Sequence, residues 1–122
     1  MASSGSFNTT GYQGRYLTFA WSVSSQSIAN NTTTIAWTLK GAGNAQSSWY
    51  RSGNFKVVIN GTTVYSSSTR IQLYDGTLVA SGNFTMTHDT AGNKTFSASA
   101  EAGIYTVAVN CSGSGTFTLP QI

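Results

Sequence analysis

The chain has 122 residues, a length that suits one domain with a single hydrophobic core. Hydrophobic residues make up 39% and aromatic residues 12%, which excludes a disordered chain, and no apolar run approaches the ~18 residues of a transmembrane helix. The net charge of +3 comes from six scattered basic residues without a cluster or a glycine-rich phosphate loop, which argues against nucleic acid as a partner.

Ser, Thr, Asn and Gly take the place of charged residues, which are only 7% of the chain, and this composition is typical of a β-sheet surface. Cys111 is the single cysteine, so an internal disulfide is excluded. The start MASSGSFNTT has neither the basic nor the apolar region of a secretory signal. We therefore expect a chain that is made and folded in a cytoplasm and does not insert into a membrane.

The N-terminal third of the chain predicts two strands. Residues 1–14 are polar and form either an arm or a short first strand. From residue 16 apolar and polar side chains alternate, the pattern of a strand with one buried face. A polar connection at 24–31 follows, with Ile28 expected at the edge of the core, and 32–40 is a second strand. The side chains expected inward are Leu17, Phe19, Trp21, Val23, Ile35, Trp37 and Leu39.

Residues 55–65 carry the strongest hairpin signal in the chain. Asn60-Gly61 accepts the positive φ angles of a type I′ turn, and β-rich runs flank it on both sides. A two-residue turn also fixes the register of the two strands. The expected cross-strand pairs are Ile59 with Thr62 and Val57 with Val64 on the buried face, and Lys56 with Tyr65 on the other.

The same argument predicts a second hairpin around Asp75-Gly76, between strands at 70–74 and 77–86. Its register places Ile71 opposite Ala80. Gly82 is expected to mark a bulge or a bend in the second strand.

Two or three further strands follow. HDTAGN at 88–93 is a turn with a glycine in the left-handed region, and 94–101 is a strand with Phe96, Ala98 and Ala100 on one face. Small residues on that face predict close approach to a large side chain across the core. Residues 104–111 alternate like another strand, Gly113-Ser114-Gly115 is expected to break it, and 116–119 is the last short strand.

This count of about seven to nine short strands, with turn signals every ~8–12 residues and no helical period, predicts an all-β protein. We expect an immunoglobulin-like antiparallel β-sandwich, with a jelly roll as the alternative. Residues 15–122 form the single sandwich domain, preceded by the arm or strand at 1–14.

The inventory of reactive side chains is sparse. The acidic residues are Asp75, Asp89 and Glu101; turns account for both aspartates, and no spacing supports a glycosidase pair. One histidine, His88, and one cysteine are too few for a typical zinc site, and carboxylates are too few for calcium. We predict no enzyme, no catalytic residue, no metal and no cofactor. His88 is expected to be a turn-edge hydrogen-bonding residue, and Cys111 a small buried one.

Residues 41–54 are the longest segment without a pattern, and they contain Trp49, Tyr50 and Arg51 side by side. Exposed aromatic rings beside amide side chains can stack on a sugar ring, so these three residues are the candidate carbohydrate site, with Tyr74 and Asp75 as helpers. The competing interpretation is that Trp49 folds back to close the end of the sandwich. Outward Tyr16, Tyr65 and Lys56 are a second candidate, as an aromatic patch or subunit interface.

Several joined segments of the chain resemble a known family. They are MASSGSF…YLTFAWSVSSQSIANNTTTIAWTL, FKVVINGTTVYSSS, HDTAGNKTFSASAEA and SGSGTFTLPQI, which together cover essentially the whole chain. The chain resembles the N-terminal part of minor structural, tail-associated proteins of tailed bacteriophages and prophages of Gram-positive bacteria. The resemblance implies a virion component made in the bacterial cytoplasm, and it offers no catalytic residues to carry over.

Two functions remain open at this point. The first is a non-enzymatic tail module that takes part in host attachment by binding cell-wall or surface polysaccharide. The second is a purely structural spacer or docking domain that contacts other tail subunits, or further copies of itself, and binds no sugar.

Overall fold

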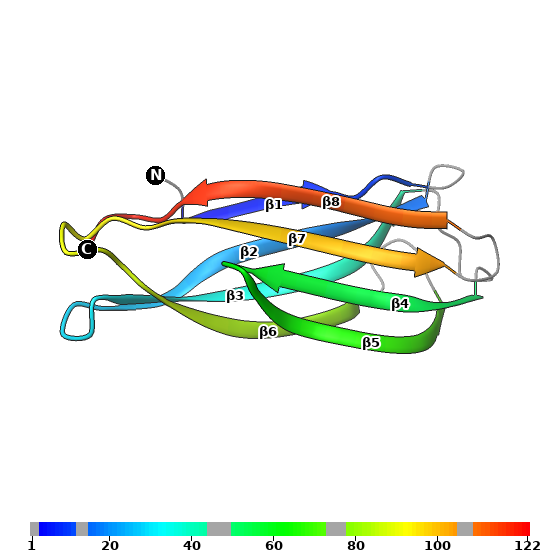
Figure 1. Ribbon diagram of the computed structural model, residues 1–122, viewed down its shortest axis with the longest axis horizontal. Helices are drawn as coiled ribbons and strands as arrows, with labels where there is room; N and C mark the ends of the chain where they lie inside the picture. The colour runs from blue at the N-terminus through cyan, green and yellow to red at the C-terminus, as the bar shows by residue number, and fades with distance from the viewer. Residues whose placement is uncertain (1–2, 12–14, 44–49, 73–77, 105–108) are drawn as a thin grey trace.

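The computed structural model describes residues 3–11, 15–43, 50–72, 78–104 and 109–122, and in these ranges it contains strands and turns but no helix (Figure 1). The strands found there form two antiparallel sheets of four strands each. Their bounds are β1 (Ser4–Asn8), β2 (Arg15–Ser27), β3 (Thr32–Gly43), β4 (Tyr50–Ile59), β5 (Thr62–Gln72), β6 (Leu78–Thr87), β7 (Thr95–Ile104) and β8 (Val109–Thr118). The predicted all-β sandwich is confirmed.

Sheet A has the strand order β1-β2-β3-β6, and sheet B has the order β5-β4-β7-β8. Four pairs of consecutive strands, β1–β2, β2–β3, β4–β5 and β7–β8, are antiparallel neighbours within one sheet in the described part of the chain. In an immunoglobulin constant domain the second and third strands lie in different sheets. The likeness to that fold is therefore one of architecture, two packed antiparallel sheets, and the order of connections is this chain's own.

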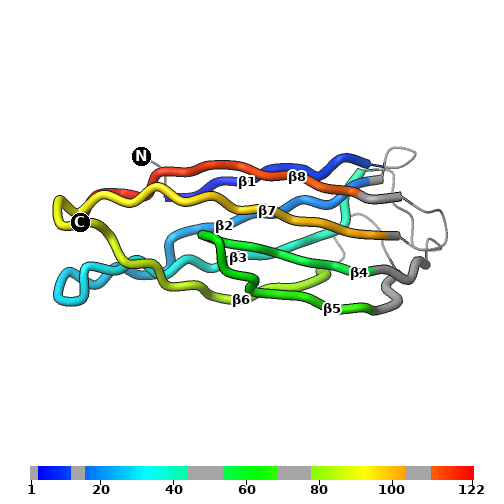
Figure 2. Tube along the Cα trace, viewed as in Figure 1, coloured from blue at the N-terminus to red at the C-terminus, as the bar shows by residue number. Residues whose placement is uncertain are grey.

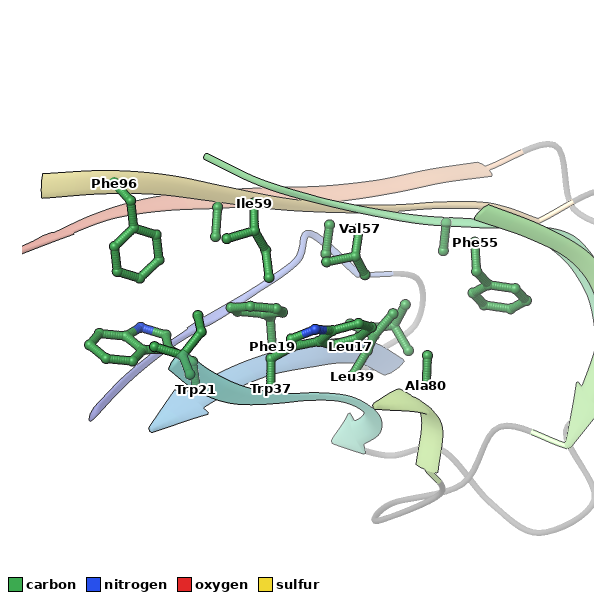
Figure 3. Close-up of a cluster of buried hydrophobic side chains, with 14 of the residues drawn as sticks. Leu17, Phe19, Trp21, Trp37, Leu39, Phe55, Val57, Ile59, Ala80 and Phe96 are labelled. Atoms are coloured by element: carbon green, nitrogen blue, oxygen red, sulfur yellow. The ribbon is translucent and has the colours of Figure 1, made fainter. Parts of the chain in front are cut away.

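The core lies between the sheets and is filled by every second residue of the central strands (Figure 3). Sheet A contributes most of the large rings, and Trp21 meets Phe96 of sheet B edge to face at a centroid distance of 5.2 Å. The predicted inward faces of the first two strands are confirmed, except that Val23 is only partly buried. Opposite the rings, β7 presents Phe96 and then the small buried residues Ala98 and Ala100, as expected, and the row continues with Ala102, beyond the predicted end of the strand.

The hairpin β4–β5 has the predicted turn, with φ of 52° at Asn60 and 78° at Gly61, and the predicted first pair, Ile59 opposite Thr62. Beyond it the register shifts by one residue. The predicted pairs Val57 with Val64 and Lys56 with Tyr65 are therefore wrong. Val57 faces Tyr65, Lys56 faces Ser66, and Val64 is the extra residue of a β-bulge.

The second predicted hairpin is wrong, because its two strands belong to different sheets. Ile71 of β5 pairs with Arg51 in sheet B, whereas Ala80 of β6 pairs with Leu39 in sheet A. Asp75 and Gly76 lie outside the described residues. An Asp-Gly pair permits a tight turn but does not choose its partners, and the inward side chains of β6 match the core face of β3 instead.

Gly82 does not mark the irregularity of β6. The register shift lies between Leu39 and Lys40, where Val79 is the extra residue, and it turns Leu78 outward to 54% exposure. Gly82 lies opposite Trp37, and a Cβ there would come within 3.2 Å of the indole ring. The glycine makes room for a large ring across the strand pair.

The chain reverses between β7 and β8, since Ile104 pairs with Val109, so the single strand predicted at 104–111 is wrong. The glycines expected to break the next run lie inside β8. A Cβ on Gly113 would stand 2.5 Å from the carbonyl oxygen of Asn8. These glycines allow the N-terminal segment, whose residues Ser4–Asn8 form strand β1, to pack directly on β8.

The sandwich therefore has two different long sides (Figure 2). We call the edge with β1 and β8 the closed side and the edge with β5 and β6 the open side. On the closed side the Thr10 amide donates a hydrogen bond to the carbonyl of Ser112 at 2.8 Å. Ile28, predicted at the edge of the core, is instead 85% exposed at the tip of the β2–β3 hairpin.

Candidate functional site

Two of the predicted carbohydrate residues, Tyr50 and Arg51, begin strand β4 at one end of the sandwich. We call it the Tyr50 end, and it comprises the strand ends at Tyr50, Gln72, Ile104 and Val109 (Figure 1). Tyr50 and Arg51 are the first residues of β4, and their side chains lie outside the described part of the structure. Trp49, Tyr74 and Asp75 also lie outside the described residues. The site itself therefore stays a prediction, and the structure defines the scaffold from which it starts.

The register brings the starting points of the two candidate segments together. Tyr50 pairs directly with Gln72 across β4 and β5. Trp49 precedes Tyr50 by one residue in the chain, and Tyr74 follows Gln72 by two. Both segments thus leave the sheet from neighbouring strands. Asn60-Gly61 lies at the other end of β4, as predicted from the hairpin, and is not part of this site.

A shallow hollow of about 430 Å³ lies on the outward face of sheet B. Lys56 and Glu101, which line it, face each other across β4 and β7, and both are exposed. Asn54, Phe55, Ser66 and Gly103 complete its lining. The sequence placed Tyr65 beside Lys56, and the bulge at Val64 puts the hydroxyl of Ser66 there instead. The hollow offers hydrogen bonds and one charge of each sign, but a single carboxyl group.

A second hollow, of about 450 Å³, lies beside the turn at 88–94 and includes His88, Asp89 and Lys94. His88 is only 4% exposed. Its Nδ1 lies 2.9 Å from the carbonyl oxygen of Gly92, which can only accept, so Nδ1 carries the proton of this bond. In the neutral ring Nε2 then accepts from the hydroxyl of Thr33, at 2.6 Å.

A hydroxyl beside a histidine is the arrangement of an activated nucleophile. Thr33, however, is completely buried, and its oxygen also accepts a hydrogen bond from Nε2 of Gln26 at 3.1 Å. No substrate carbon can reach this oxygen in the folded protein. The pair instead ties β3 to the turn after β6, and the prediction that His88 is a hydrogen-bonding residue of this turn is confirmed, with the ring buried.

Asp89 serves the same turn. Its Oδ1 accepts hydrogen bonds from the amides of Ala91 at 3.0 Å and Asn93 at 2.8 Å, and Gly92 adopts φ of 82°. The carboxylate thus satisfies two backbone donors, as the turn interpretation of this residue predicted. Asp89 holds the turn and is not positioned by it for chemistry.

Cys111 is buried on the inward face of β8, as predicted. Burial raises the pKa of its thiol above the ordinary value of 9.0, because a thiolate would lose its hydration there. The thiol is therefore a packing group. Among the described residues, His, Cys, Asp and Glu side chains do not gather in any group of three that could hold a metal ion.

The outward patch predicted from Tyr16, Tyr65 and Lys56 does not form. Tyr65 turns inward opposite Val57 and packs partly buried against the core, because the bulge at Val64 changes its face. Tyr16 and Lys56 lie on different sheets. What the outward faces carry instead is hydroxyl groups, some of them bonded in pairs across strands, as Thr34 with Thr85 at 2.7 Å and Thr95 with Thr118 at 2.9 Å.

In the part of the chain that the structure describes, there is no helix of the length and apolarity needed to cross a membrane. Comparisons of the chain with family models, with curated proteins and with solved structures find no match.

Proposed function

We propose that this chain is a non-enzymatic module of a bacteriophage tail that takes part in host attachment by binding cell-surface polysaccharide at the Tyr50 end. One observation carries the location of the site: Tyr50 pairs with Gln72, so the segment that holds Trp49 and the segment that holds Tyr74 and Asp75 start from adjacent strands. The assignment to a phage tail and to a host-surface ligand rests on the family resemblance.

The scaffold suits such a site. β4 pairs with β5 from Tyr50 onward and with β7 over residues 53–59, so Tyr50 and Arg51 extend from a strand that is bonded on both sides. The rings of Trp49 and Tyr50 would stack on the apolar face of a sugar, and Arg51 would donate hydrogen bonds to its hydroxyl groups. Binding at a strand end leaves both outward faces free for neighbouring subunits.

The described side chains support a binding role over catalysis. Glu101 stands in the sheet B hollow beside Lys56 without a second carboxyl group in the lining, and Asp89 is engaged by two turn amides. Hydrolysis of a glycosidic bond ordinarily requires a pair of carboxyl groups on either side of the scissile bond.

The alternative is a purely structural spacer or docking domain. It draws support from the outward faces of the two sheets. Among the described outward-facing side chains, Tyr16 is the single aromatic one, and most of the others carry hydroxyl groups. This alternative predicts no affinity for any wall polysaccharide.

The test is a pull-down of the 122-residue chain on purified cell walls of Gram-positive bacteria, followed by glycan-array binding. Trp49→Ala and Tyr50→Ala should each reduce binding by about tenfold or more while the circular dichroism spectrum stays unchanged. Ile28→Ala is the matched control, because Ile28 is an exposed apolar side chain at the opposite end. Absence of binding, or binding equally reduced by Ile28→Ala, contradicts the proposed site.

A further inference from the structure

Each sheet has two edge strands, and such an edge presents unpaired backbone N–H and C=O groups to any strand that approaches. The edges are β1 and β6 in sheet A, and β5 and β8 in sheet B. Natural proteins protect edges with short strands, charged side chains, proline, bulges or a covering segment. The four edges of this sandwich differ in how many of these devices they carry.

The closed side is protected by its own geometry. β1 is only five residues long. The segment that follows it covers β8, because the Thr10 amide donates to the Ser112 carbonyl and the Thr10 hydroxyl accepts from the Ser112 amide at 3.1 Å. Gly113 lies against the backbone of Asn8 and Thr9. A further strand therefore cannot add to this part of β8.

On the open side, β5 and β6 differ. β5 has the bulge at Val64 and carries Arg70 in its sequence, and both features oppose pairing with another strand. β6 contains no charged residue and no proline in LVASGNFTMT. Its bulge lies at Val79, near its start, and residues 80–87 pair with β3 in an unbroken register. Among the described strands, β6 thus has the longest regular edge without a charge or a cover.

The side chains of β6 also favour a neighbour. Val79 and Phe84 point toward the core but stay only partly buried, and Leu78 is 54% exposed. On the outward face Ser81, Asn83 and Thr85 are short polar side chains, which pair well across antiparallel strands. A strand added to this edge would cover Phe84 and bond to the free backbone groups at once.

We propose that β6 of a second copy of this chain occupies this edge, in an antiparallel pair that joins the two copies of sheet A into one continuous sheet. A two-fold pair brings each strand near its own symmetry mate, so a charge at its middle would face a like charge. β6 is uncharged throughout, and this neutrality is what self-pairing requires. The proposal is independent of the polysaccharide site at the Tyr50 end.

The test is sedimentation equilibrium of the 122-residue chain at increasing concentration. A single strand pair is a small interface, so dimers should appear between about 10 µM and about 1 mM. Asn83→Lys, an exposed position at the middle of the edge, should weaken the dimer at least about tenfold. Amide hydrogen exchange should slow in β6, and not in β5, as the concentration rises.

Ser22→Lys is the matched control. Ser22, Ala36 and Asn83 lie in one row across sheet A, so this variant adds the same charge to the same face two strands away from the edge. It should leave the dimer unchanged. A chain that stays monomeric at about 1 mM overturns the proposal, as does a dimer that Asn83→Lys leaves intact. A dimer weakened equally by both variants overturns it too, since the effect would then follow net charge.

Discussion

The closed and open sides of the sandwich bring two edge strands together by different means. On the closed side, Gly113 allows two backbones to touch, because a Cβ there would stand 2.5 Å from the carbonyl oxygen of Asn8. Gly5 instead makes room for side chains, since its Cβ would stand 2.7 Å from Nε1 of Trp21 and 2.8 Å from the ring of Phe117 in β8. On the open side the edge strands carry larger side chains, such as Tyr65 and Phe84, which pack only partly buried against the core. The closed side is covered by close packing of β1 and its following segment on β8, whereas the open side keeps partly exposed apolar side chains that a second molecule could cover.

This difference assigns a separate role to each side of the sandwich. The closed side stabilises the fold, and the open side can take part in assembly at small cost to the fold. The largest effects on stability should therefore come from changes on the closed side.

Gly113→Val should cost about 3 kcal/mol in the free energy of unfolding, because its side chain would displace the Asn8–Thr9 backbone. Urea unfolding followed by tryptophan fluorescence measures this loss. Ser114→Val is the control, since Ser114 is the exposed next residue of the same strand, and it should change stability by less than about 0.5 kcal/mol. Equal effects of the two variants would show that backbone contact does not hold the closed side.

Phe117→Ala and Phe84→Ala compare the two sides directly. Both rings are partly buried, but Phe117 also packs against the rings of Trp21 and Phe96, at centroid distances of 5.3 Å and 5.6 Å. We expect a loss of about 3 kcal/mol for Phe117→Ala and about 2 kcal/mol for Phe84→Ala in urea unfolding of the monomer. A larger loss for Phe84 than for Phe117 would reverse the assignment of the stabilising side.

Thr33→Val tests the anchor at the end of the open side, where His88 follows β6. The substitution removes the hydroxyl that His88 Nε2 contacts and should cost about 1 to 2 kcal/mol, because the buried ring nitrogen loses its partner. Hydrogen exchange should accelerate near the end of β6. Thr34→Val, at the next and more exposed position, should cost less, and an equal cost would argue against the anchor.

Cys111 should give the smallest effect, and it depends on pH. Burial raises the pKa of the folded thiol, so its contribution to stability is complete below the unfolded value of 9.0 and is lost as pH rises above it. The native chain should therefore lose more stability between about pH 8 and about pH 10 than Cys111→Ala does. Identical losses would mean that the thiol is not desolvated on the closed side.

Some features of the candidate site depend on neighbouring residues in the sequence, and others depend on contacts between distant segments. The turn roles of His88 and Asp89 followed from HDTAGN, because a turn is built from a few consecutive residues. The pairing of Tyr50 with Gln72 did not follow, since the predicted second hairpin assigned the end of β5 to a different partner. The outward position of Ser66 in place of Tyr65 was equally hidden, because nothing in the sequence marks the bulge at Val64.

The sequence by itself determined the buried faces of β2, β3 and β7, because alternation along a strand is a property of neighbouring residues. Trp21, Trp37 and Phe96 could be assigned to the core for that reason. Apart from the β4–β5 pair, which Asn60-Gly61 marks in the sequence, only the tertiary structure decided which strands became neighbours and which edge stayed uncovered. Those choices depend on contacts between distant segments. Gly82 leaves room for the ring of Trp37, and Gly113 leaves room for the backbone of Asn8, so the role of each glycine depends on the group that packs against it.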